Sequence, residues 1–136
     1  MFNKESLITN ARSWLNVPWK HGQRDKNIGV DCVNFLFAVG EDTGLVLPPF
    51  PDKYSPIARG TEILDYLSAN FTQVDEIEPA DILLIKFSGY NTHVAIATSP
   101  TTMIHACLRR KRVVEHAIDD VWRRTIDSIW EIELQL

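Results

Sequence analysis

The hydrophobic period of the chain changes near residue 81, and this change limits the folds that are open to it. From there onward the sequence reads as five short segments of apolar and β-branched residues separated by turn-like residues, which is the pattern of consecutive β-strands. The segments are DILLIKF, HVAIAT, TMIHACL, RVVEHAI and TIDSIWEIEL. We expect an antiparallel meander sheet of about five strands, because short connections of this kind join neighbouring antiparallel strands.

The first half of the chain has the period of helices. One helix is indicated by apolar residues on a single helical face, and it ends before Pro18. These residues are Leu7, Ile8, Ala11, Trp14 and Leu15. A second helix begins after Asp31, a good N-cap, and runs to Gly44; it is apolar nearly all round and is therefore expected to be buried. A short helix follows at residues 61–69, after a proline-rich irregular stretch.

Helices followed by consecutive strands predict an α+β fold in which the buried helix packs on the antiparallel sheet. With 136 residues, the chain has the size of a single domain that spans residues 1–136. The formal net charge is −4, and the basic residues gather only in one short run at residues 109–112. This charge pattern gives no footprint for nucleic acid, so no nucleic-acid partner is expected.

The amino terminus bears on where the protein acts. It carries charged residues where a secretory signal needs its apolar segment, and no window approaches the roughly 18 apolar residues of a membrane helix. We therefore expect synthesis in the cytoplasm without a signal peptide, and no membrane partner. Release as part of a larger particle is compatible with this expectation.

Cys32 directly follows the capping residue Asp31, so the buried helix is expected to carry this cysteine at its N-terminus. There the sulfur lies among N–H groups without helical partners, at the positive end of the helix dipole, and the thiolate is favoured. The carboxylate of Asp31 opposes this effect unless it accepts the capping hydrogen bonds. A small buried cysteine is the alternative interpretation of the same position.

Two histidines occupy neighbouring predicted strands. His93 opens one strand and His105 lies twelve residues later in the next, so a tight turn between them sets both histidines near one site. Strand alternation places His93 on the face of Ala95, and His105 on the face of Met103 and Cys107. A cysteine nucleophile needs a base and a third group that orients the base, and these two histidines fit those roles.

Zinc binding is the competing hypothesis for the same residues. Cys32, His93, His105 and Cys107 could form a two-cysteine, two-histidine set. Structural zinc sites usually pair ligands two to four residues apart at both ends, however, and Cys32 has no such neighbour. The nucleophile hypothesis is therefore preferred. His116 is expected to face solvent.

Several stretches occur in an order that resembles a known family. They are VPWKHGQ, GVDCVNF, EPADILLIKF, THVAIAT and MIHA. This order is similar to that of the NlpC-type cysteine peptidases of bacterial cell-wall turnover, in which Asp-Cys opens a helix and His-Val opens a strand. The stretches HGQR, RVVEH and WRRTI, together with the motifs around the cysteine and the histidines, resemble the branch found in phage tails and gene-transfer particles.

The resemblance implies a papain-like α+β fold and hydrolysis of amide bonds in peptidoglycan stem peptides, with the bond from the γ-carboxyl of D-glutamate to a diamino acid favoured. Position by position, it implies Cys32 as the nucleophile, His93 as the general base and His105 as the residue that orients the base. The implied partners are the peptidoglycan stem peptide and phage-tail or gene-transfer-particle proteins. Neither a metal nor an organic cofactor is implied.

Three further residues are expected in the vicinity of the substrate and the oxyanion: Trp19, His21 and Asp31. The Cys32 backbone N–H, at the start of the helix, is expected to donate to the oxyanion. His21 lies in the loop that precedes the cysteine, where it either lines the cleft or, as the preferred alternative, is exposed at the surface.

The chain also departs from the family pattern. Trp19 stands where the family usually has tyrosine, Val33 and Asn34 replace Ser-Gly, and Ala80 replaces the glycine before Asp81. The last change is mild if the turn has negative φ. These departures keep two alternatives open: a catalytically weak or inactive tail module that binds the wall, and a cysteine amidase or acyltransferase on another substrate.

Overall fold

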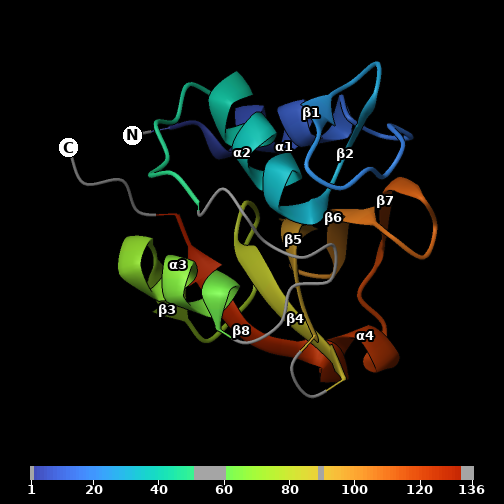
Figure 1. Ribbon diagram of the computed structural model, residues 1–136. Helices are drawn as coiled ribbons and strands as arrows, with labels where there is room; N and C mark the ends of the chain where they lie inside the picture. Colours follow the sequence, from blue (N-terminus) through green and yellow to red (C-terminus); the bar gives the residue numbers. More distant parts are fainter. Residues whose placement is uncertain (1, 51–60, 89–90, 133–136) are drawn as a thin grey trace.

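The computed structural model describes residues 2–50, 61–88 and 91–132 (Figure 1). Three helices come from the first half of the chain: α1 (Lys4–Arg12), α2 (Cys32–Asp42) and α3 (Glu62–Asn70). The helix that was expected to end before Pro18 ends earlier, at Arg12, and turns carry the chain onward. None of the helices in the described ranges is long and apolar enough to cross a lipid bilayer.

Six strands form one antiparallel sheet in the order β3-β8-β4-β5-β6-β7. Their bounds are β3 Thr72–Val74, β4 Ile82–Ser88, β5 Asn91–Ser99, β6 Thr102–Cys107, β7 Arg112–Ala117 and β8 Ile126–Glu131. All five predicted strands are present, and the short β3 is an addition. The α+β prediction is confirmed.

The meander prediction is wrong for the last strand. Strands β4 to β7 follow one another in space as predicted, but β8 returns across the sheet and pairs with β4 and β3. A short helix, α4 (Asp120–Thr125), lies between β7 and β8 and was not predicted. The alternating pattern of β8 indicates a strand, but it holds no information about which neighbour that strand pairs with.

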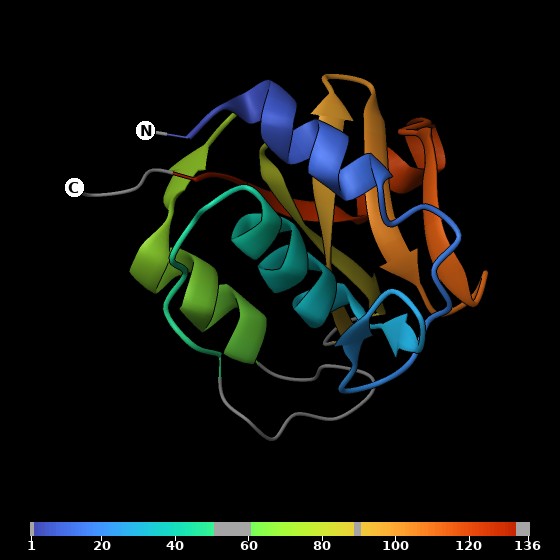
Figure 2. The ribbon, with the colours of Figure 1, turned by 90° about the horizontal axis from the view of Figure 1, so that it is seen from above.

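The sheet has two apolar faces. Helix α2 lies over one of them, with α1 and α3 to its sides (Figure 2). The buried residues of β5 and β6 on this face are Val94, Ile96, Ile104 and Ala106. The opposite face carries a smaller cluster that includes Ala95, Ala97, Met103 and Trp122 of α4. The predicted alternation along β5 and β6 is therefore confirmed.

A two-stranded hairpin precedes α2 and leads directly to its N-terminus. It consists of β1 (Arg24–Asp25) and β2 (Gly29–Val30). Gly29 has a φ of 155°, and a Cβ atom there would lie 2.6 Å from the Lys20 Cβ and 3.0 Å from the Pro18 carbonyl oxygen. Only glycine fits without displacing this neighbouring segment, so Gly29 fixes the path of the chain into α2.

Candidate active site

The start of α2 is fixed by the buried carboxylate of Asp31. Its Oδ1 accepts a hydrogen bond from the Asn34 N–H at 2.8 Å, which caps the helix as predicted. Its Oδ2 accepts from the Gly22 N–H at 2.6 Å and lies 3.6 Å from the His21 Nδ1. One buried side chain therefore holds the His21 loop against the turn of helix that carries Cys32.

Cys32 is the first residue of α2, and its sulfur lies against the backbone of β5. The backbone N–H groups of Val94, Val33 and Cys32 itself lie near the sulfur and favour its anion. Within the described residues, β5 pairs with β6 from Ile96 onward, so the beginning of β5 leaves room for the helix end. The sulfur thus lies beside the residue that follows His93.

The electrostatic state of this thiol differs from the expectation. The pKa of the Cys32 thiol is raised to about 12, mainly by burial and also by the negative charge of Asp31, although three backbone N–H groups lower it. This shift runs opposite to the expected preference for thiolate. Removing the sulfur from water costs the anion more than the helix N-terminus returns.

His93 and His105 meet directly, as predicted. The His93 Nε2 lies 2.7 Å from the His105 Nδ1, and both side chains are buried. Burial lowers the pKa of His93 to about 4. Burial, with the neighbouring His93 and His116, lowers the pKa of His105 to about 2. Both rings are consequently neutral at neutral pH.

His116 does not simply face solvent, so that expectation is wrong. Its Nε2 lies 2.8 Å from the His105 Nε2, and its Nδ1 lies 2.9 Å from the Ala117 carbonyl oxygen. His116 pairs with Met103 across β6 and β7, so its side chain lies on the same face as His105. The side chain is partly buried. A third imidazole therefore extends the predicted pair.

Two aromatic rings pack against the histidines. Phe87 lies 5.7 Å from the His93 ring centroid, and Trp122 lies 5.4 Å from the ring of His105 and 4.8 Å from that of His116. Trp122 belongs to α4, whose Asp119 caps the helix by accepting from the Trp122 N–H at 2.9 Å. The Asp residues before WRRT were a capping signal that could have revealed this helix.

Among the described residues, no hydrogen bond joins the Cys32 sulfur to the His93 ring. The Nε2 of His93 is engaged with His105, so Nδ1 is the ring nitrogen that remains for a thiol. Such bonds are often long before substrate binds and shorten in the reactive complex. The structure brings together the two histidines and places the sulfur against the strand that carries His93.

The residues that depart from the family pattern are also placed. Trp19 packs against the main core, and its backbone N–H donates to the Lys111 carbonyl at 2.9 Å. The Asn34 side chain accepts from the Arg24 Nε at 3.0 Å. Ala80 has a φ of 74°, so the condition that would make the loss of glycine mild is not met.

The four zinc-candidate residues do not form a cluster in the structure. Within the described ranges, no three histidine, cysteine or acidic side chains gather in a way that would hold a metal ion. Cys107 is buried and its sulfur accepts a hydrogen bond from the Arg110 N–H at 3.4 Å.

Comparison with known proteins agrees with this arrangement. Residues 16–131 match the model of the NlpC/P60 family. An NlpC/P60 family protein from Bacillus cereus superposes with a TM-score of 0.72 at 17% identity, covering 96% of this chain and 40% of that one. The NlpC/p60 domain of the peptidoglycan hydrolase SagA gives a TM-score of 0.66 at 23% identity, covering 95% of this chain and 98% of that one.

A third structure, the peptidoglycan hydrolase RipB from Mycobacterium tuberculosis, gives a TM-score of 0.69 at 18% identity and covers 97% of this chain and 65% of that one. The TM-scores of these three structures establish a shared fold, and the predicted papain-like architecture is confirmed. The chain spans about two fifths of the length of the Bacillus cereus protein. Comparison with curated protein sequences gave no match. Because the family model covers most of the chain, including Cys32, His93 and His105, the chain belongs to the NlpC/P60 family.

Proposed function

We propose that this protein is a cysteine peptidase that hydrolyses amide bonds in peptidoglycan stem peptides. Cys32 acts as the nucleophile, His93 as the general base and His105 as the positioning residue for the base. The observation that carries the proposal is the 2.7 Å contact between the His93 Nε2 and the His105 Nδ1, on the strand whose next residue contacts the Cys32 sulfur. This combination supplies a nucleophile, a base and a group that orients the base.

The reaction follows from these positions. The His93 Nδ1 accepts the thiol proton as the Cys32 sulfur attacks the amide carbonyl carbon, and a tetrahedral oxyanion forms. The backbone N–H groups of Cys32 and Val33, which surround the sulfur, are suited to donate to that oxyanion. His93 then gives its proton to the leaving amine and a thioester remains. Water, deprotonated by His93, hydrolyses the thioester and restores the thiol.

The substrate class comes from the relatives. Two of the similar structures are peptidoglycan hydrolases, SagA and RipB. The γ-D-glutamyl bond to the diamino acid is the bond that we propose as the site of cleavage. Delivery to the wall by a phage tail or gene-transfer particle, after synthesis in the cytoplasm, is part of the same proposal.

One observation favours a second function. A Cys32 thiol with its pKa raised to about 12 is the state expected of an inert cysteine in a module that only binds the wall. The two functions differ in whether wall fragments are released, since the binding module needs no chemistry.

Mass spectrometry of purified sacculi separates the two functions. Sacculi are incubated with wild type, with Cys32→Ala and with Cys107→Ala as the matched control for loss of a thiol. The peptidase proposal predicts new stem-peptide fragments with wild type and Cys107→Ala but none with Cys32→Ala. Retention of all three proteins on the sacculi without fragments would support the binding module and overturn the peptidase.

A further inference from the structure

Three imidazole rings form a continuous hydrogen-bonded chain across β5, β6 and β7. The His93 Nε2 lies 2.7 Å from the His105 Nδ1, and the His105 Nε2 lies 2.8 Å from the His116 Nε2. This row of three imidazoles ends at a backbone group, because the His116 Nδ1 lies 2.9 Å from the Ala117 carbonyl oxygen. The function proposed above uses only the first two rings.

The contact between His116 and the Ala117 carbonyl determines the direction of each hydrogen bond that links the three imidazoles. A carbonyl oxygen only accepts, so the contact with Ala117 is a hydrogen bond when His116 carries its proton on Nδ1, and a ring with that single proton accepts at Nε2. His105 must therefore donate from Nε2 and accept at Nδ1. His93 must in turn donate from Nε2, and this leaves its Nδ1 without a proton.

We infer that His116 and the Ala117 carbonyl set the tautomers of the whole histidine chain and thereby make the Nδ1 of His93 the nitrogen that can accept a proton. The consequence for catalysis rests on the proposed function, because only a base at that position deprotonates the Cys32 thiol. In the opposite tautomer, His93 would present an N–H at Nδ1 and could not act as the base. His116 is thus a positioning residue two rings removed from the reacting atoms.

The surroundings of the chain support this assignment. His93 and His105 are buried, and burial holds the pKa of both rings well below the ordinary value, so each is neutral and has a single proton to place. Trp122 packs over His105 and His116 with ring centroids 5.4 and 4.8 Å away, which covers the contact between them. With a single proton on each ring, the three histidines have one consistent hydrogen-bond direction when the last acceptor is a carbonyl oxygen.

Nitrogen NMR of the histidine-labelled protein tests the inference without reference to activity. The ¹⁵N shifts distinguish protonated from unprotonated ring nitrogens. We expect the protonated nitrogen to be Nδ1 in His116 and Nε2 in both His105 and His93. Finding Nε2–H on His116, or Nδ1–H on His93, in the wild-type protein would overturn the inference.

Two variants test the coupling between the rings. His116→Phe keeps a ring against Trp122 but accepts no hydrogen bond, so we expect His105 and His93 each to become a mixture of tautomers. His116→Gln retains an acceptor for the His105 N–H, and we expect it to keep the wild-type tautomer of His105. Unchanged spectra of His105 and His93 in His116→Phe would show that His116 does not set their tautomers.

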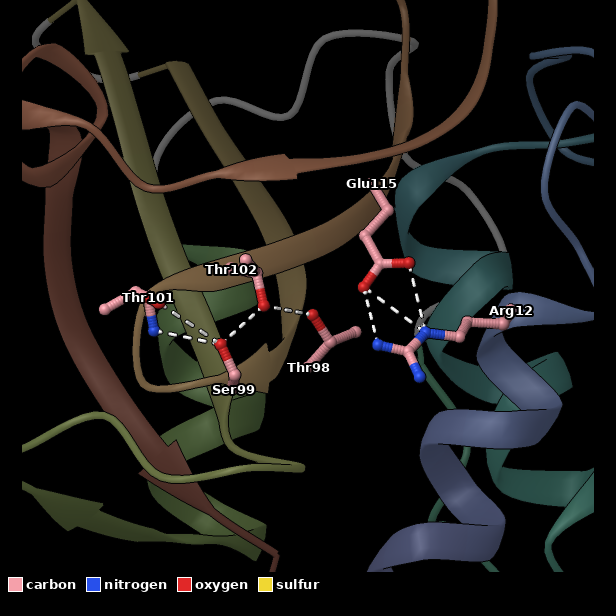
Figure 3. Close-up of polar contacts among 6 residues, drawn as sticks. All are labelled: Arg12, Thr98, Ser99, Thr101, Thr102 and Glu115. Carbon is pink, nitrogen blue, oxygen red and sulfur yellow. Dashed lines mark hydrogen bonds and ion pairs between the residues drawn. The ribbon is translucent and has the colours of Figure 1, made fainter.

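The neighbouring residue on β7 offers a matched control. Glu115 pairs with Arg12 of α1 at 2.9 Å, beside a cluster of hydroxyl groups at the β5–β6 turn (Figure 3). Its side chain points away from the histidine face, because neighbouring strand residues alternate. Glu115→Gln should leave all three tautomers unchanged, and a change there would point to a general loosening of β7.

Activity on sacculi links the tautomers to the reaction. We expect kcat to fall about tenfold in His116→Phe with little change in KM, which corresponds to the loss of one neutral hydrogen bond. His116→Gln should restore most of kcat. Wild-type kcat in His116→Phe would overturn the positioning role. Wild-type tautomers as assigned, in a protein that releases no wall fragments, would instead refute the proposed function and leave the tautomer assignment intact.

Discussion

Acidification from pH 7.5 to 4.5 is expected to remove about 5 kcal/mol from the free energy of unfolding. The cause is the pair of buried neutral rings, since the pKa of His93 lies at about 4 and that of His105 at about 2 in the folded protein, against 6.5 for an exposed histidine. Both groups bind protons less tightly when folded. Protonation of these groups therefore has no effect on stability well above pH 6.5, and it favours the unfolded state increasingly as the pH falls below 6.5.

The size of this loss of stability follows from the difference between the folded and unfolded pKa values. At pH 4.5 the pH lies about 2 units below the pKa of an unfolded histidine, so protonation stabilises the unfolded state by about 2.7 kcal/mol for each ring. The folded rings are protonated very little at this pH and offset almost none of this free energy. Two rings give about 5 kcal/mol. This is comparable with the total stability of many domains, so partial unfolding near pH 4.5 is expected. The pKa of Glu115 is lowered by Arg12, and its contribution is lost mainly below pH 4.5, outside this window.

Urea unfolding followed by tryptophan fluorescence at several pH values measures this loss. The slope between pH 6 and 4.5 should correspond to about two protons, and in His105→Asn it should fall to about one. The slope is compared rather than the absolute stability, because the substitution itself destabilises the fold. A total loss below about 1.5 kcal/mol, or equal slopes in the two proteins, would refute the assignment of both rings as buried and neutral.

Three further outcomes follow from the structure. Alkylation of Cys32 by iodoacetamide, measured in Cys107→Ala, should keep accelerating with pH beyond 10 because the pKa of Cys32 is raised to about 12, and a half-maximal rate below pH 8 would contradict the raised pKa. Gly29→Ala should destabilise the protein by about 1–3 kcal/mol in thermal unfolding, because its methyl group would collide with the Pro18 carbonyl oxygen; wild-type stability would contradict this contact. Ala80→Gly should lie within about 1 kcal/mol of wild type, because relief of the left-handed backbone offsets a lost buried methyl group and a more flexible unfolded chain. Ala80→Val should lose about 2 kcal/mol or more, and equal stability of these two Ala80 variants would refute the strain.

The sequence was sufficient to predict the helix that carries Cys32, the five longer strands of the sheet and the pairing of His93 with His105. Three local signals carried these predictions: the period of the apolar residues, the N-cap residue Asp31 and the twelve-residue spacing between His93 and His105. The partner of β8 is a long-range property, and its alternating pattern is satisfied on any edge of the sheet. That is why the strand was placed beside the wrong neighbour.

His116 was misassigned for a related reason. Its segment alternates between apolar and polar residues, and a polar residue in such a strand normally faces water. The face of β7 that carries His116 is instead covered by Trp122, from the helix that was not predicted. Because α4 was not predicted, the contact of His116 with His105 was not predicted either.

The raised pKa of the thiol and the lowered pKa of the histidines have the same cause and point to one mode of activation. Burial disfavours the anion of Cys32 and the cation of His93 alike, so a resting thiolate–imidazolium pair would need two unfavourable charges in one desolvated place. The resting site therefore holds a neutral thiol and a neutral base. In the proposed reaction, proton transfer then accompanies attack on the carbonyl, where the developing charge moves to an oxygen that backbone N–H groups can stabilise. In such a site the tautomer of His93 matters more than its pKa, because an imidazole with its proton on Nδ1 cannot take part at all.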